Sequence, residues 1–349
     1  MSKQLFDWNK PAVIVKNNFK FKSLSDWSFN TAVGCAHACR FCYVPSVSTG
    51  KGAMAAKLRS MGVADPDADW GSYVAVRPWH ESVFMRSLYE ANDKPLAELS
   101  ADGNRAVMFS TTTDPYQVLA GESGEKHMTL VRRALSAISS LSTLNVRILT
   151  RSPLARKDFP LMKTFGNRLM FGMSLPTLND RLARIYEPHA PSPTARLNCL
   201  RAAHEAGLNI FVAVAPTYPE CDVRDMERTL RAIAPLNPLT VFMEPINIRA
   251  ENIERIRKHA ESIGETVNMS PFASPSSQRS YAISSLLDMT FAAKLAGLES
   301  RLHLWPDSAL GSKVALEEIA KAYPSEGYAT HLHWLQNCWN RVSEWPGKP

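Results

Sequence analysis

Three cysteines lie within eight residues of the chain, with three and then two residues between them: Cys35, Cys39 and Cys42. Thiolates at this spacing can bind three irons of a cubane iron–sulfur cluster and leave the fourth iron without a protein ligand. An open iron beside a reducing cluster is a place where another molecule can bind and react. The spacing therefore predicts a [4Fe-4S] cluster with these three cysteines as its metal ligands.

Two other interpretations of the cysteine loop are weaker. His37 and the three cysteines could form a zinc site, but structural zinc normally draws its ligands from two separated knuckles. His37 is expected to pack or hydrogen-bond beside the cluster instead. The remaining cysteines, Cys199, Cys221 and Cys338, are too scattered for a second cluster or a disulfide framework. Cys199 and Cys338 fall in apolar helical patterns and are expected in the core.

The composition is that of a folded protein without a membrane span. Of the 349 residues, 45% are hydrophobic and 21% are charged, which is enough apolar material for a sizeable core. No run of about 18 apolar residues occurs, and the first residues lack the apolar stretch of a secretory signal. We expect a cytoplasmic location, where thiols stay reduced, and a monomer.

The net charge of +7 suits an anionic partner without identifying one. Nine Lys and Arg against two acids fall between Glu125 and Arg168, the most one-signed region of the chain. This region could be a nucleic-acid surface. A set of solvated helix faces is the slightly better interpretation.

Short apolar runs alternate with amphipathic segments over much of the chain. The expected strands are 27–33, 106–110, 145–150, 169–174, 208–214 and 239–243. The expected helices between and after them are 126–141, 154–165, 193–206, 223–234 and 252–263. This alternation predicts an α/β fold with a parallel sheet and right-handed crossovers, a partial (β/α)6 TIM-type barrel.

Reactive residues of such a barrel lie at the carboxyl ends of its strands. Here the apolar runs end in polar or reactive residues, which are Cys35, Thr111 to Asp114, Arg151, Ser174, Thr217 and Glu244. Glu244 could contact a substrate or form a hydrogen bond at the barrel mouth. The strand ends therefore predict one site that the cysteine loop shares.

The remaining segments predict three regions. Residues 1–26 are expected to form an N-terminal arm and residues 27–264 the barrel, with an irregular insertion at 44–105. Within the insertion we expect helices at 53–61 and 82–88 and a short strand at 73–77. Residues 265–349 are expected to be a mostly helical extension packed on the barrel, with helices at 278–296 and 330–342 and a strand-like stretch at 301–305.

The segment from Gly34 to Tyr43, placed at the end of the first strand, resembles the cysteine loop of the radical S-adenosylmethionine (SAM) superfamily. Four further motifs, at 110–115, 149–152, 173–177 and 187–196, are similar to those of its spore photoproduct lyase branch and lyase-like relatives. The likeness covers roughly residues 25–250. It implies that SAM chelates the open iron, and that its reductive cleavage gives a 5′-deoxyadenosyl radical that takes hydrogen from a substrate.

The resemblance also implies cofactor-binding residues and an electron donor. Tyr43 would line the adenine or methionine side of SAM, and Thr113 occupies the place of a cofactor-binding serine. Arg151 could pair with the SAM carboxylate in bidentate fashion. Ser174 matches a serine near the ribose, and Arg196 matches a helix arginine. Reduction of the cluster implies a low-potential donor of the flavodoxin or ferredoxin type.

Thr111 departs from the pattern of the branch. Spore photoproduct lyase has a hydrogen-donating cysteine at this place, and a threonine hydroxyl is a poor hydrogen-atom donor. We therefore expect a different substrate. Cys221 and Tyr218 follow a strand end on the expected active face, and they are candidate catalytic residues for a radical relay, with an inert loop thiol as the alternative for Cys221.

Three functions remain open at this point. The first is a lyase-like radical SAM enzyme that acts on nucleic acid or a nucleotide-derived lesion, as in DNA repair. The second keeps the radical chemistry but takes a small metabolite or peptide. The third is a non-enzymatic iron–sulfur electron carrier, which would not need polar residues around its cluster.

Overall fold

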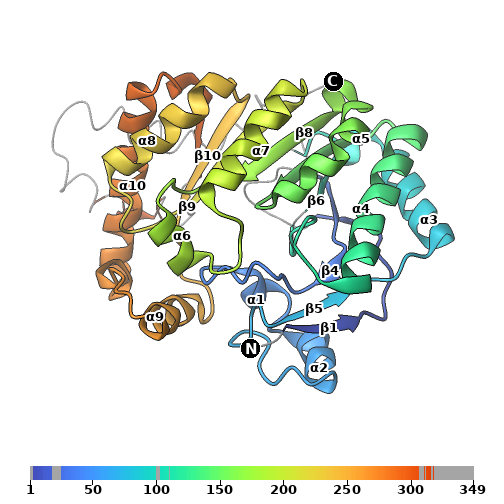
Figure 1. Cartoon of the computed structure of the whole chain (residues 1–349), viewed down its shortest axis with the longest axis horizontal. Helices are drawn as coiled ribbons and strands as arrows, with labels where there is room; N and C mark the ends of the chain where they lie inside the picture. Colours follow the sequence, from blue (N-terminus) through green and yellow to red (C-terminus); the bar gives the residue numbers. More distant parts are fainter. Residues whose placement is uncertain are drawn as a thin grey trace.

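Seven parallel strands form the main sheet of the computed structural model (Figure 1), which describes residues 3–17, 25–99, 103–109, 111–305, 310, 312–315 and 317. Six of them were expected as barrel strands: β3 (Trp27–Phe29), β6 (Ala106–Phe109), β7 (Asn145–Thr150), β8 (Leu169–Ser174), β9 (Asn209–Thr217) and β10 (Thr240–Pro245). The seventh, β11 (Leu302–Leu304), confirms the strand-like stretch expected at 301–305, and it pairs with β10.

The barrel is open. β2 (Ile14–Lys16) pairs antiparallel with β3 and forms one edge of the sheet, while β11 forms the other. Within the described ranges these two edge strands do not pair with each other. The prediction of a partial barrel of parallel strands is confirmed, and one strand from the tail extends it.

Helices cover the outer face of the sheet (Figure 1), as right-handed crossovers require. They are α4 (Gly121–Leu141), α7 (Pro193–Glu205), α8 (Val223–Ile233) and α10 (Pro275–Leu295), whereas α9 (Asn252–Ser262) lies beside the cysteine loop. Residues 154–165 were expected to be one helix but form the 3-10 helix η2 (Pro153–Asp158) and the short α5 (Phe159–Lys163). Pro160 in the first turn of α5 lacks the N–H that would continue the helix from η2.

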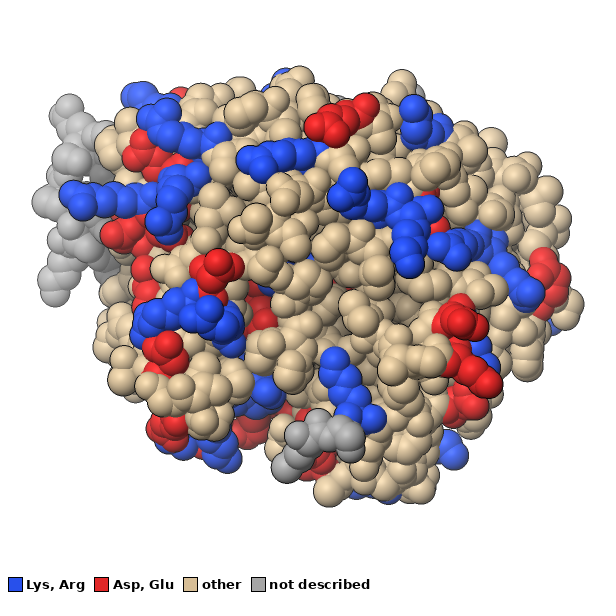
Figure 2. Space-filling model, viewed as in Figure 1, with Lys and Arg blue, Asp and Glu red and all other residues tan. Residues whose placement is uncertain are grey.

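The basic region between Glu125 and Arg168 does not form one surface. Arg147 is 1% exposed inside the fold, whereas Arg132 and Lys157 are exposed on the outer helices. Figure 2 shows Lys and Arg spread over the helices of this face, with Asp and Glu between them. This distribution fits solvated helix faces better than a nucleic-acid surface.

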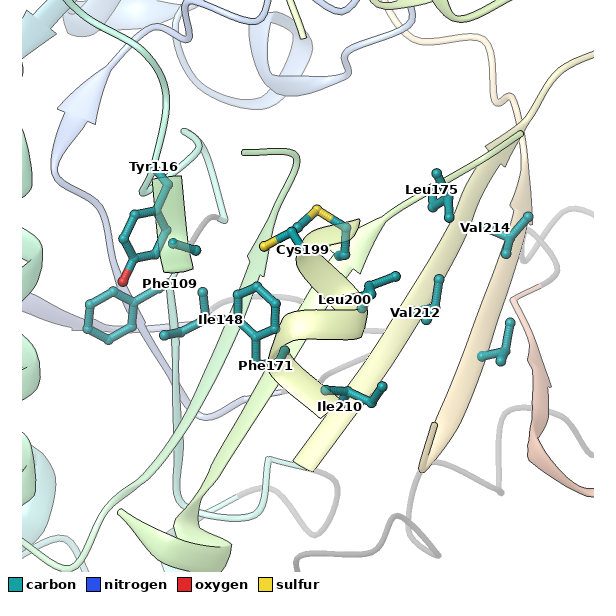
Figure 3. Packing of buried hydrophobic residues seen from close by; sticks show 14 of the residues in the cluster. Phe109, Tyr116, Ile148, Phe171, Leu175, Cys199, Leu200, Ile210, Val212 and Val214 are labelled. Atoms are coloured by element: carbon teal, nitrogen blue, oxygen red, sulfur yellow. The ribbon is translucent and has the colours of Figure 1, made fainter. Parts of the chain in front are cut away.

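Alternate side chains of each strand face the helices and form the main core. Figure 3 shows this layer, in which Ile148 of β7 and Phe171 of β8 lie near Cys199 and Leu200 of α7. Cys199 is fully buried, so its predicted place in the core is confirmed.

The inner face of the sheet is filled by an aromatic cluster that contains Phe211, Phe242 and Trp305. Gly172 of β8 makes room for it, because a Cβ at this position would lie 2.1 Å from Cζ of Phe211. Atoms cannot approach so closely, so only glycine lets the Phe211 ring fill the inside of the barrel. The cluster forms a solid floor beneath the carboxyl ends of the strands.

A second, smaller sheet supports the cysteine loop. It has the order β1 (Gln4–Asp7), β5 (Tyr73–Val76), β4 (Ala32–Val33). The expected strand 27–33 is therefore two strands in two different sheets, since β3 joins the barrel and β4 pairs antiparallel with β5. The short strand expected at 73–77 is confirmed as β5.

The insertion and the tail contain further helices. The insertion holds α1 (Val44–Val47), α2 (Gly52–Ser60) and α3 (Glu81–Asn92). The last expected helix, 330–342, and Cys338 lie outside the described residues. The proposed region boundaries at 26 and 264 stay predictions. In the part of the chain described, no helix has the length and apolar character needed to cross a membrane.

Candidate functional site

A cavity of about 460 Å³ lies at the carboxyl ends of the parallel strands. Cys35, Cys39 and Cys42 line it together with residues that follow five different strands of the barrel. These strand-end residues are Thr111 to Asp114 after β6, Arg151 after β7, Ser174 at the end of β8, Ala215 and Pro216 of β9, and Glu244 and Pro245 of β10. The structure thus brings the cysteine loop and the predicted strand ends into one site.

The first half of the cysteine loop is held by the segment after β6. Thr113 donates a hydrogen bond of 2.6 Å from Oγ1 to the carbonyl of Gly34. Gln117 accepts one of 2.6 Å from the backbone N–H of Ala36, and its amide donates one of 2.7 Å to Thr113. Gly34 itself has a φ of 91°, and a Cβ there would lie 2.4 Å from the carbonyl oxygen of Tyr73. The loop can therefore start only with glycine.

The second half of the loop is held by α9, which the sequence did not suggest. Arg255 donates to the carbonyl of Cys42 at 2.6 Å and to that of Arg40 at 3.2 Å. Asn252 donates to the carbonyl of Phe41 at 3.2 Å. Both side chains lie on one face of α9, three residues apart. Three consecutive carbonyls of the loop are thus fixed from one helix.

The three thiols share a buried environment. Burial raises the pKa of Cys35, Cys39 and Cys42 to about 12 each, and neighbouring negative charge adds to this rise. Cys35 contributes to the rise at Cys39, and Cys39 to that at Cys42, so the thiols lie near one another. Because thiolates are the metal-binding form, loading the site with metal must release protons.

The donor set fits a cluster. Among the described residues, no three Cys, His, Asp or Glu side chains surround one point closely enough to hold a single metal ion. The ligands of a cubane are arranged differently, because each thiolate binds its own iron. Three thiols on one wall of a cavity, with polar strand ends opposite, are compatible with that arrangement.

Asp114 links the cysteine loop to the end of β7. Its carboxylate accepts hydrogen bonds from Thr150 Oγ1 at 2.6 Å and from the backbone N–H of Arg151 at 2.8 Å. Nε2 of His37 lies 3.2 Å from Oδ2, the oxygen that also accepts from Arg151. Burial alone would raise the pKa of Asp114, but His37 and these hydrogen bonds hold it at about 2. His37 lies beside the thiols, as expected.

Glu187 joins the two predicted cofactor arginines. Arg151 donates from Nε to Glu187 at 2.5 Å, and Nη1 of Arg196 lies 2.6 Å from its other oxygen. Burial would raise the pKa of Glu187, but the two guanidinium groups lower it. Arg151 lines the cavity, whereas Arg196 is 1% exposed and does not. The sequence analysis did not predict a role for Glu187. The only signal in the sequence was that Glu187 is the first residue of the 187–196 motif.

The other predicted residues are divided between the cavity and the core. Tyr43 and Ser174 line the cavity, and Tyr43 donates to the carbonyl of Thr111 at 3.3 Å. Tyr218 and Cys221 are buried and do not line it. The ring of Tyr218 stacks on Tyr186, with 4.0 Å between the ring centroids. The geometry therefore gives no support to a relay through Tyr218 and Cys221.

A family model described as the radical SAM superfamily matches residues 29–233, which is more than half of the chain. The chain belongs to the radical SAM superfamily. Membership implies an enzyme that uses SAM and an iron–sulfur cluster and that needs a reductant. The cysteine loop and the strand ends of β6, β7, β8 and β9 fall inside the matched range.

Chains with similar sequences occur in a virus and in mycobacteria. An uncharacterized protein of Acidianus two-tailed virus is 34% identical over 249 residues, which are 69% of this chain and 74% of the relative. An uncharacterized protein of Mycobacterium tuberculosis is 27% identical over 196 residues, 56% of this chain. The match spans only half of the mycobacterial relative, 50% of its length.

Solved structures of spore photoproduct lyase have a similar fold. One is a double mutant with bound AdoMet and dinucleoside spore photoproduct, and another is a complex with dinucleoside spore photoproduct. Each has a TM-score of 0.57 at 12% identity and covers 83% of this radical SAM chain and 80% of the lyase. At this identity the likeness shows the fold alone.

Proposed function

We propose that this radical SAM enzyme holds a [4Fe-4S] cluster on Cys35, Cys39 and Cys42 and binds SAM in the cavity beside it. The observation that carries this proposal is the convergence of the three thiols and the polar strand ends on one cavity. When bound, the cluster and SAM supply a 5′-deoxyadenosyl radical, which abstracts hydrogen from the substrate. The protein contributes the position of each group and the exclusion of water.

Three side chains of the cavity are suited to SAM. The guanidinium of Arg151 can pair with the carboxylate of SAM, since only its Nε is used by Glu187. The Tyr43 ring and Ser174 are placed to contact the adenosine portion. Thr113 acts through the loop instead, because its hydroxyl is already bonded to Gly34 and Gln117.

We further propose that the substrate is nucleic acid or a nucleotide-derived lesion. Trp305, after β11, and Arg249, after β10, also line the cavity. A planar indole can stack with a base, and a guanidinium can bind a phosphate. The fold of spore photoproduct lyase, whose solved structure holds a dinucleoside product, supports this choice. Thr111, whose side chain accepts a 2.7 Å hydrogen bond from Asn30, stands where spore photoproduct lyase has its hydrogen-donating cysteine. A lesion other than spore photoproduct is therefore the better candidate.

A small metabolite or peptide is the second candidate. It is favoured by the position of the exposed basic residues of 125–168, which lie on outer helices and do not line the cavity. Such a substrate would contact only the cavity and would not need an extended basic surface.

The test starts with reconstitution of the protein with iron and sulfide without oxygen. With SAM and dithionite, we expect visible iron–sulfur absorption and formation of 5′-deoxyadenosine. Both should be lost in Cys39→Ala and retained in Cys199→Ala, a matched control in the core. Deuterated oligonucleotides, nucleosides and peptides then identify the substrate by transfer of deuterium to 5′-deoxyadenosine. No 5′-deoxyadenosine from a fully loaded protein would refute the proposed function.

A further inference from the structure

We propose that a cationic surface behind the cysteine loop is the docking site of an acidic, low-potential electron carrier of the flavodoxin type. This electron-donor surface consists of Lys3, Arg40, Arg184, His189 and His259. The inference rests on the proposed function, because only a reducible cluster needs such a partner. In the docked complex the carrier would lose one electron and the cluster would gain it.

Backbone hydrogen bonds bring α6 (Asp180–Tyr186) and the segment after it against the cysteine loop. The N–H of Arg40, which lies between the second and third cysteines, donates to the carbonyl of Tyr186 at 2.9 Å. The N–H of His189 donates to the carbonyl of His37 at 3.2 Å. Arg184 lies on the last turn of the same helix and is exposed, as is His189.

Two further elements complete the electron-donor surface. Nε2 of His259 on α9 lies 3.4 Å from the carbonyl of Arg184. Exposed Lys3 immediately precedes β1, whose first N–H bonds to Ser72 at 2.7 Å. The neighbouring Gly71 packs directly on the loop, since a Cβ there would lie 2.1 Å from Cβ of Ala38. Four segments far apart in the sequence therefore meet behind the cluster-binding loop.

The positive charge of this surface comes from Lys3, Arg40 and Arg184. Burial lowers the pKa of His189, and nearby positive charge, that of Lys3 and Arg40 first, lowers it further. Two acids on neighbouring segments are already engaged, since Glu265 pairs with Arg181 and Glu254 with Arg257.

The basic side chains of the surface keep their charge available to a partner. Within the described residues, Lys3, Arg40 and Arg184 form no ion pair with a carboxylate. An acidic partner would meet an uncompensated basic surface, which steers encounter and sets orientation.

The surface faces away from the substrate. None of its five residues lines the cavity. Arg40 nevertheless lies near the metal-binding groups, because it directly follows Cys39 in the cysteine loop. Burial lowers the pKa of Arg40, and the charge of Cys39 raises it. A carrier at this surface would approach the cluster through the loop while the cavity stays open to SAM and substrate. Transient electron-transfer complexes use small contact areas, so a surface of this kind is sufficient.

The experiment compares two charge-reversal variants of the full chain. The test variant is Lys3→Glu with Arg184→Glu, which leaves the cysteine loop and the cavity intact. The control is Arg156→Glu with Lys157→Glu, which makes the same charge change at exposed positions of η2. Binding of oxidised flavodoxin is measured at low salt through its flavin fluorescence, and reduction of the cluster by reduced flavodoxin or by dithionite is followed by visible absorption.

We expect the test variant to bind flavodoxin about 10-fold more weakly and to be reduced by it more slowly, because complementary charges drive the encounter. Reduction by dithionite should match that of the wild type, and the control variant should behave as the wild type throughout. Wild-type binding should weaken with salt. Equal flavodoxin binding by the test variant, or no binding by the wild type, would overturn the docking site. If the cluster-loaded wild type did not cleave SAM in the presence of dithionite, the proposed function would be refuted. The result on flavodoxin binding would still stand.

Discussion

Glu187 and Asp114 are buried carboxylates that connect neighbouring strand ends at the cavity. Glu187 lies between Arg151 and Arg196, at 2.5 and 2.6 Å. Asp114 lies between His37 and the backbone of Arg151. Buried charges are tolerated only when they are paired and hydrogen-bonded, and each of these groups meets that condition. Arg151 is thus held from both sides, by its backbone and by its side chain.

Replacement of Glu187 by Gln should weaken the binding of SAM. The neutral amide leaves Arg151 and Arg196 without a buried counter-charge, which costs about 3 kcal/mol of unfolding free energy. We expect about 10-fold weaker SAM binding by the loaded protein, measured by equilibrium dialysis, with partial recovery in Glu187→Asp.

Glu254→Gln is the matched control, because Glu254 belongs to a half-exposed pair on the surface of α9. It should leave both stability and SAM binding nearly unchanged, because exposed ion pairs contribute little to stability. If Glu187→Gln lowered stability but bound SAM normally, Glu187 would be a structural residue and not a positioning one.

Asp114 should make stability depend on pH in the acid range. Its pKa is lowered from 3.8 to about 2 in the folded protein. A carboxyl with a depressed pKa stabilises the fold above the unfolded pKa and loses this contribution as the pH falls through the folded pKa. The difference amounts to roughly 2 kcal/mol. Urea unfolding of wild type and Asp114→Asn should therefore differ most near neutral pH and converge as the pH approaches 2; a constant difference would contradict this account.

At the scale of elements, the cysteine loop is a short segment supported on three sides. β4 and β5 fix its start, the segment after β6 binds Gly34 and Ala36, and α9 binds the carbonyls of its second half. The loop is therefore shaped before any metal binds. Preformed loops lose less conformational entropy when they take up their ligand.

Arg255→Ala should impair loading of the cluster. The change removes the hydrogen bonds from α9 to the carbonyls of Arg40 and Cys42, which frees the second half of the loop. We expect iron content after reconstitution to fall to about half or less, and the metal-free protein to lose about 2 kcal/mol of unfolding free energy. Arg257→Ala on the exposed side of the same helix should load normally, and equal loading by both variants would count against the role of Arg255.

Local patterns predicted the elements, but they could not show how the elements meet. Apolar runs and the helical period identified six strands and most helices, because these signals arise within a few residues. The division of 27–33 into β3 and β4 is set by pairing with distant β6 and β5, which no local pattern records. The contact of Arg255 with the cysteine loop likewise joins residues 213 positions apart in the sequence. The site formed by Cys35, Cys39 and Cys42 could be predicted because these residues are close in sequence. The role of Glu187 could not, because its partner Arg151 is distant in sequence.

At the scale of the molecule, positive charge is divided between three regions. The electron-donor surface lies behind the cysteine loop, and Arg249 lines the cavity. The exposed basic residues of η2 and α5 lie on the outer layer of helices. The net charge of +7 is therefore not one continuous surface.

Arg249→Gln should weaken the binding of a nucleic-acid substrate about 10-fold and reduce its salt dependence, because one phosphate contact is lost. Arg156→Gln with Lys157→Gln should leave binding and salt dependence unchanged, since these residues lie outside the cavity. Fluorescence anisotropy with a labelled oligonucleotide measures both. The opposite result would place the substrate on the outer helices.

The open edge of the barrel has a consequence for the shape of a substrate. Asn17 follows β2 and Trp305 follows β11, so residues next to both edge strands line the cavity. In the described residues no ladder of hydrogen bonds joins these edges, and the sheet is not closed into a ring. Under the proposed function, a strand of nucleic acid would not need to have its ends threaded through a closed ring to present one unit to the reactive centre.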